Sequence, residues 1–152
     1  MSLADKLSSL DRSIAAFMRK HGFVALRIAL AIIFIWFGIL KPFNLSPAET
    51  LVIKTVDWMP LLTGQAWLAI IGWWEVAIGV TFLLPKTVRL AIALLAMQMV
   101  GTFLPLVILP EITFQEGRIP YGLTLEGQYI VKNLLIIASA LVIGGTVRSS
   151  KS

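Results

Sequence analysis

The sequence contains no cysteine and a single histidine, His21, among its 152 residues. The lack of cysteine excludes disulfide exchange, a thiolate nucleophile, an iron–sulfur cluster and a thiolate metal site within this chain. His21 lies at the expected edge of a membrane helix, so a haem held by two histidines of one chain is excluded, and we expect no metal site. Any redox chemistry must therefore come from a bound organic cofactor or from another subunit.

Charged residues are also scarce, at 14% of the chain, whereas 58% of the residues are hydrophobic and the mean hydropathy is +0.89. Soluble domains contain about 25% charged residues, so this composition indicates one membrane domain. The net charge of +5 comes from basic residues at the ends of apolar segments, where they meet anionic lipid. No pattern indicates nucleic-acid binding, a phosphate-binding loop or a nucleophile–base pair, so a self-contained hydrolase or ATP-driven pump is not expected.

Four apolar segments are each long enough to cross a bilayer core of about 30 Å. We expect spans at about 22–41, 66–84, 90–109 and 127–147, which together form a transmembrane domain over residues 22–147. Pro105 should bend the far end of the third span, because proline cannot continue a helix without a kink. The predicted fold is an all-α integral membrane four-helix bundle.

Two helices are expected outside the spans. Residues 1–21 form an amphipathic surface helix, or alternatively a frayed soluble tail, because apolar residues recur at three–four spacing at Leu3, Leu7, Leu10, Ile14 and Phe17. The stretch Ser46-Pro47-Ala48-Glu49 combines an N-cap serine, a first-turn proline and a glutamate at the third helical position. It predicts a short interfacial helix in the first outer loop that ends at Pro60.

Loop charges predict the orientation in the membrane. Basic residues gather before the first span, in the turn after the second span and in the tail 148–152, whereas the opposite side is mainly acidic. Because cytoplasmic loops carry the excess of lysine and arginine, both termini and the tail should be cytoplasmic. We expect a multi-pass protein of a bacterial plasma (inner) membrane.

One carboxylate, Glu75, lies near the middle of the second span. An ionised carboxylate at that depth costs several kcal/mol unless it is paired, so Glu75 should face protein and have a basic partner. With a helical rise of about 1.5 Å per residue, Glu75 is roughly 12–14 Å deep and Lys132 roughly 9 Å deep. We therefore predict that Lys132 pairs with Glu75, with Arg27 and Arg89 as second choices, whereas Lys41 can reach the head groups at its helix end.

A polar pocket in the outer half of the bundle follows from this placement. Asn133 and Gln98 would complete the hydrogen bonds of the ion pair, and Trp36, Trp73 or Trp74 would form aromatic walls. Such a pocket could hold a quinone head group or pass a proton, and the alternative is an ion pair that only fixes helix register. No catalytic residue is assigned; the candidates for ligand binding or proton relay are Glu75, Lys132, Asn133, Gln98, Trp74, Arg27, Lys41 and Arg89.

The chain resembles the DoxX-like superfamily of small four-helix membrane proteins, closest to its YkgB-type branch. The resemblance covers residues 26–145 and rests on short motifs in order: Leu26-Arg27, Phe37-Gly38-Ile39-Leu40-Lys41, Gly72-x-x-Glu75-x-x-x-Gly79, Arg89, Thr124-Leu125-Glu126-Gly127-Gln128-Tyr129 and Lys132-Asn133. It implies an association with redox processes or oxidative stress, and it places Arg27, Lys41, Glu75, Arg89 and Lys132 at the family's polar positions. Similar bundles that reduce quinones with thiols differ from this chain, which has no cysteine.

Three functional hypotheses follow. The first is a quinone-associated protein or the membrane subunit of a redox complex, which would be at most a subunit of an oxidoreductase. The second is a non-catalytic accessory subunit of a larger membrane assembly, and the third is a small transporter. The expected cofactor is none within the chain itself, or a quinone; the expected partners are the lipid bilayer and other membrane or redox-complex subunits, with a homo-oligomer left open.

Overall fold

A computed structural model describes residues 3–147 of the chain, and this part is built from helices. They are α1 (Leu3–Leu40), α2 (Glu49–Val56), α3 (Gly64–Leu83), the 3₁₀ turn η1 (Pro85–Thr87), α4 (Val88–Phe103), α5 (Pro105–Ile108), α6 (Pro110–Thr113) and α7 (Leu125–Thr146). Four segments are long and apolar enough to cross a membrane, namely Leu7–Leu40, Gly64–Leu83, Pro85–Ile108 and Leu125–Thr146. The predicted all-α four-helix membrane bundle is confirmed.

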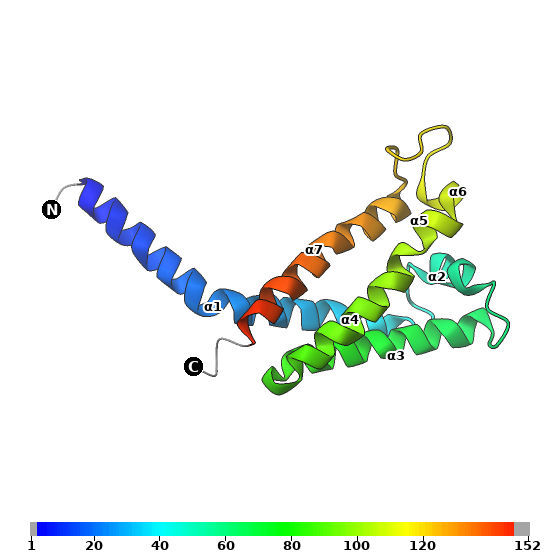
Figure 1. The fold of residues 1–152 in the computed structure, drawn as a ribbon, viewed down its shortest axis with the longest axis horizontal. Helices are drawn as coiled ribbons and strands as arrows, with labels where there is room; N and C mark the ends of the chain where they lie inside the picture. Colours follow the sequence, from blue (N-terminus) through cyan, green and yellow to red (C-terminus); the bar gives the residue numbers. More distant parts are fainter. Residues whose placement is uncertain (1–2, 148–152) are drawn as a thin grey trace.

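The four long helices form a ring in which α1 packs on α3, α3 on α4, α4 on α7, and α7 on α1 (Figure 1). The short helices α2, α5 and α6 gather at one end of this bundle, here called the α2 end. The turn η1 and the C-terminal end of α7 lie at the opposite end, here called the turn end. Helix α1 therefore runs toward the α2 end, and α3 runs back from it.

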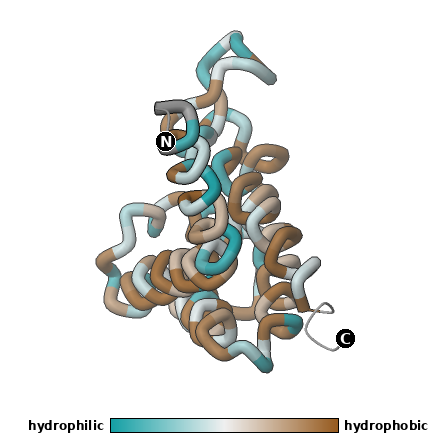
Figure 2. Tube along the Cα trace, turned by 90° about the vertical axis from the view of Figure 1, so that its left-hand side faces the viewer, coloured by the Kyte–Doolittle hydropathy of each residue, from teal (hydrophilic) through white to brown (hydrophobic). Residues whose placement is uncertain are grey.

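Helix α1 differs from the prediction because no break separates a surface helix from the first span. Gly22 lies at the predicted boundary, but one glycine costs only about 1 kcal/mol relative to alanine, which is too little to end a helix. The N-terminal part of α1 instead projects away from the bundle at an angle (Figure 1) and carries hydrophilic residues among the apolar ones (Figure 2). Residues 1–2 of that predicted helix and the predicted tail 148–152 lie outside the described part of the chain.

Threonine hydroxyls cap two of the membrane helices. Thr63 accepts a hydrogen bond from Ala66 N at the start of α3, and Thr124 accepts one from Gly127 N at the start of α7, both at 3.2 Å. Helix α2 begins at Glu49, later than predicted, since Ser46 Oγ bonds to Ala48 N outside the helix. Helix α7 begins at Leu125, two residues before the start of the predicted fourth span.

The bundle is closely packed toward the turn end. The main cluster of buried apolar side chains comes from the C-terminal third of α1, from α4, and from the halves of α3 and α7 that lie nearest η1. They include Phe34, Ile78, Phe82, Leu95 and Ile143. Apolar side chains on the outer faces of the four helices remain exposed, as expected where lipid rather than water surrounds the bundle.

Glycines bring α1 and α3 into direct backbone contact. A Cβ atom at Gly72 would lie 2.6 Å from Gly38 O, and one at Gly79 would lie 2.8 Å from Ala31 O. Neither position has room for a side chain, so Gly72 and Gly79 permit the close contact of the two helices. This contact also holds the C-terminal end of α1 against the turn of α3 that carries Glu75, because a Cβ at Gly38 would lie 2.9 Å from Glu75 Cβ.

Candidate functional site

Glu75 forms an ion pair with Lys41, the residue that follows the last turn of α1. Lys41 Nζ donates a hydrogen bond to Glu75 Oε2, and the two side chains are only 7% and 13% exposed. The ammonium group also lies 3.4 Å from Phe37 O, one turn back along α1. The expectation that Glu75 faces protein and has a basic partner is therefore confirmed.

The predicted partner, Lys132, is wrong. Side chains of a helix tilt toward its N-terminus, so Lys41 reaches back from the end of α1 into the bundle, while Glu75 on the antiparallel α3 reaches toward the α2 end. The ammonium group of Lys41 and the carboxylate of Glu75 therefore meet at a depth between the two backbone positions. Lys132 lies on α7, which begins at the α2 end, so the same tilt directs its side chain toward that end and away from Glu75. The Lys132 side chain is exposed, and its Nζ lies 5.1 Å from the centre of the Tyr129 ring.

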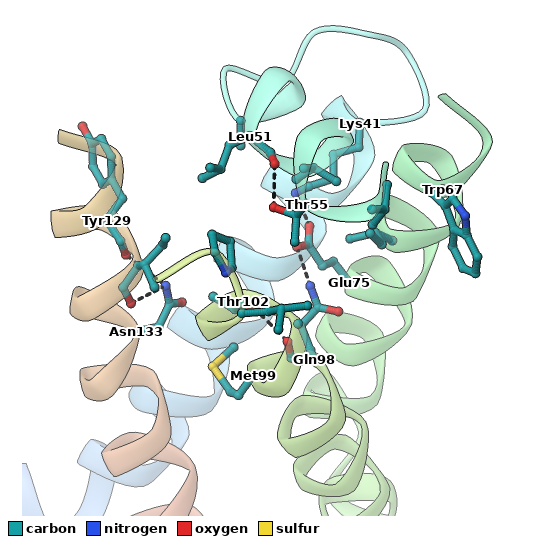
Figure 3. A pocket seen from close by; sticks show the side chains of 18 of the residues that line it. Lys41, Leu51, Thr55, Trp67, Glu75, Gln98, Met99, Thr102, Tyr129 and Asn133 are labelled. Carbon is teal, nitrogen blue, oxygen red and sulfur yellow. Dashed lines mark hydrogen bonds and ion pairs between the residues drawn. The ribbon is translucent and has the colours of Figure 1, made fainter. Parts of the chain in front are cut away.

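Gln98 completes the polar group from a third helix, α4. Its Nε2 donates to Glu75 Oε1 at 3.0 Å, so the two oxygens of the carboxylate bond to α1 and α4 (Figure 3). A buried ion pair needs such further hydrogen bonds to offset its desolvation. The prediction that Gln98 supports the pair is confirmed.

This polar group lies in the wall of a cavity of about 390 Å³ at the α2 end of the bundle. The lining comes from α1, α2, α3, α4 and α7, with α2 lying across the top in the close-up view (Figure 3). Most lining side chains are apolar, among them Phe34, Leu51, Ile71 and Met99. Among the described residues that line it, only Lys41 and Glu75 are charged, so the cavity has one charged pole and an apolar remainder.

The structure brings four of the eight candidate residues to this cavity: Lys41, Glu75, Gln98 and Asn133. Asn133 lies on α7, across the cavity from α3, and its Nδ2 donates to Tyr129 O and Ile130 O of its own helix (Figure 3). The polar pocket predicted from the sequence is thus present, but Lys41 takes the place given to Lys132.

The other candidates lie elsewhere. Arg27 donates from Nε to Phe82 O and from Nη2 to Leu83 O, both at 3.0 Å, and so binds free carbonyls at the C-terminal end of α3. Trp74 Nε1 donates to Leu94 O and holds α3 against α4. Arg89 is exposed at the start of α4, at the turn end.

The aromatic wall comes from residues that the sequence did not single out for this role. Trp36 and Trp73 are 64% and 54% exposed on outer helix faces, whereas Trp67 and Tyr129 line the cavity. Trp67 precedes Glu75 by eight residues on α3, but the two side chains extend to different sides of that helix (Figure 3), so the spacing gave no signal for its role. The apolar face of α2 also lines the cavity, through Leu51, Val52 and Val56, and so does Met59 beyond the end of that helix.

Comparisons of the chain with protein-family models, with curated proteins and with solved structures found no match. The class of the protein therefore rests on its fold and site. It is a four-helix membrane bundle with a cavity of ligand size, whose wall is mostly apolar and has one buried ion pair as its charged group.

Proposed function

We propose that this protein binds a quinone or a similar lipid-soluble molecule in the cavity, with the head group beside Lys41, Glu75 and Gln98. The observation that carries the proposal is the cavity itself, whose volume of about 390 Å³ falls within the range of ligand sites. Its mostly apolar wall suits a molecule taken from lipid, and its charged pole suits the polar part of such a molecule.

Further proposals follow from the residue pattern of the chain. The motifs around Arg27, Lys41 and Glu75 support membership of the DoxX-like superfamily, near its YkgB-type branch. That membership favours a membrane subunit of a redox or oxidative-stress complex. The distribution of basic residues supports a bacterial plasma membrane with both termini in the cytoplasm.

Binding is favoured over transport because the packed part of the bundle lies between the cavity and the turn end. Phe82, Leu95 and Ile143 are fully buried or nearly so between the helices there, and none of the three lines the cavity. A transported solute would need this core to open. If the protein were only an accessory structural subunit, the ion pair could still fix the contact of the helices, but the cavity beside it would have no role.

The proposal is tested by removing both charges together, since a buried pair that is removed as a unit leaves no unpaired charge. The variant carries Lys41→Met and Glu75→Gln, and the matched control carries Lys132→Met and Glu116→Gln on exposed residues. Retained quinone is extracted from purified protein and identified by mass spectrometry. Affinity for a short-chain quinone is then measured by quenching of tryptophan emission in lipid nanodiscs.

Wild-type and control protein should bind the quinone alike, and the cavity variant should bind it about tenfold more weakly, which corresponds to about 1.4 kcal/mol. Circular dichroism should show the same helix content in all three. Folded wild-type protein that retains no quinone and does not respond to added quinone would refute the proposal.

A further inference from the structure

Two threonine hydroxyls in the cavity wall have already donated their hydrogens. Thr55 Oγ1 donates to Leu51 O at 2.6 Å, and Thr102 Oγ1 donates to Gln98 O at 3.0 Å, each within its own helix (Figure 3). A hydroxyl has one hydrogen and two lone pairs, so each oxygen can still accept but not donate. Both residues line the cavity.

Two amide side chains in the wall are restricted in the same way. Asn133 Nδ2 donates to the carbonyl oxygens of Tyr129 and Ile130, at 3.0 and 3.1 Å. Gln98 Nε2 donates to the Glu75 carboxylate. Carbonyls and carboxylates accept only, so these partners determine which amide atom is nitrogen and which is oxygen. The oxygens of Asn133 and Gln98 accept no hydrogen bond from any residue that the structure describes.

Two N–H donors remain for a ligand beside the ion pair. Lys41 has three N–H groups, of which Glu75 and Phe37 O take two, and Gln98 keeps one amide hydrogen. The Trp67 indole N–H has no partner within the described part of the chain, but Figure 3 places this ring well apart from Asn133, at the edge of the group. Tyr129 is 61% exposed, at the rim of the cavity.

We infer that the cavity prefers a head group that donates hydrogen bonds, so that it binds a membrane-soluble phenol or hydroquinone more tightly than the matching quinone. Each hydroxyl of a ligand can donate its hydrogen to one of the open oxygens of Thr55, Thr102, Gln98 or Asn133. A quinone carbonyl meets them with another acceptor, and an acceptor that loses water without gaining a donor is destabilised. This inference rests on the proposed function, because it specifies the head group that the same cavity takes.

The first experiment compares two matched pairs of ligands on wild-type protein in nanodiscs without oxygen. One pair is a decyl benzoquinone and its hydroquinone, and the other is 4-decylphenol and its methyl ether, in which methylation removes the donor. The donor-bearing member of each pair should bind about tenfold more tightly. Equal binding, or tighter binding of the acceptor-only member, overturns the inference while leaving the proposed function in place; no binding of any of the four ligands overturns both.

The second experiment tests whether the wall oxygens cause the preference. The variant carries Thr55→Val and Thr102→Val, which retain side-chain shape but remove two acceptors. The control carries Thr81→Val and Thr146→Val, since these hydroxyls also bond to carbonyls of their own helices but lie away from the cavity. The ratio of phenol to ether affinity should fall about threefold or more in the variant and stay unchanged in the control. An unchanged ratio in the variant overturns the inference.

Discussion

Lys41 and Glu75 depend on each other because both charges lie inside the bundle, where water does not solvate them. Removal of one partner leaves an uncompensated buried charge, whereas removal of both leaves an apolar wall that can pack. The Gln98 amide stabilises the carboxylate but cannot neutralise it. The pair therefore stabilises the contact of α1 with α3 and also defines the charged pole of the cavity.

Lys41→Met should lower the free energy of unfolding by about 3–5 kcal/mol, because Glu75 then has no cation within reach. Addition of Glu75→Gln should restore most of this loss. Lys132→Met, on an exposed side chain, should change stability by less than about 0.5 kcal/mol. Unfolding in detergent, followed by circular dichroism, measures the four free energies of the double-mutant cycle. A cost for Lys132→Met equal to that of Lys41→Met would contradict the pairing.

At the scale of elements, α1 and α3 are joined at two levels as well as through their glycines. Arg27 binds the carbonyls of Phe82 and Leu83 at the turn end, and Lys41 binds Glu75 near the α2 end. Fourteen residues separate the two basic side chains, which is about 21 Å along a helix. This helix pair makes the most extensive contact in the bundle, and α4 and α7 complete the ring.

Gly72→Ala should destabilise the bundle by about 1–3 kcal/mol, since its Cβ would lie 2.6 Å from the backbone oxygen of Gly38. Gly101→Ala is the matched control in a membrane helix, because a Cβ there meets nothing within 4 Å. The control should be neutral, or more stable by up to about 1 kcal/mol through its higher helix propensity. Thermal unfolding in the same detergent compares the two, and equal effects would contradict the close contact of α1 and α3.

The sequence predicted the elements better than their contacts. Hydrophobic length located the four spans, because that signal is local. The partner of Glu75 could not be found from the depth of each Cα atom in the membrane, because side chains tilt toward helix N-termini and their charged groups lie at other depths. The close glycine contact that brings Lys41 to Glu75 is a property of two helices together. The cavity likewise results from the packing of five elements.

At the scale of the whole molecule, the bundle is solid toward the turn end and hollow toward the α2 end. Helix α4 ends at Phe103 before Pro105, and its last two turns form part of the cavity wall. Met97 and Gly101 line the cavity and are both exposed. We expect the cavity to open beside them toward lipid, as the proposed function requires.

Gly101→Trp should close this side opening. A side chain at Gly101 meets no atom within 4 Å of its Cβ, so an indole can lie across the opening without disturbing the helices. Ligand affinity should fall about tenfold or more, while the melting temperature stays within about 2 °C of wild type. Gly145→Trp is the matched control, since Gly145 on α7 also has open space around it but does not line the cavity. An indole at this opening and the apolar chain of a bound ligand cannot occupy the same volume. Unchanged affinity in a folded Gly101→Trp protein would therefore show that the ligand enters or binds elsewhere.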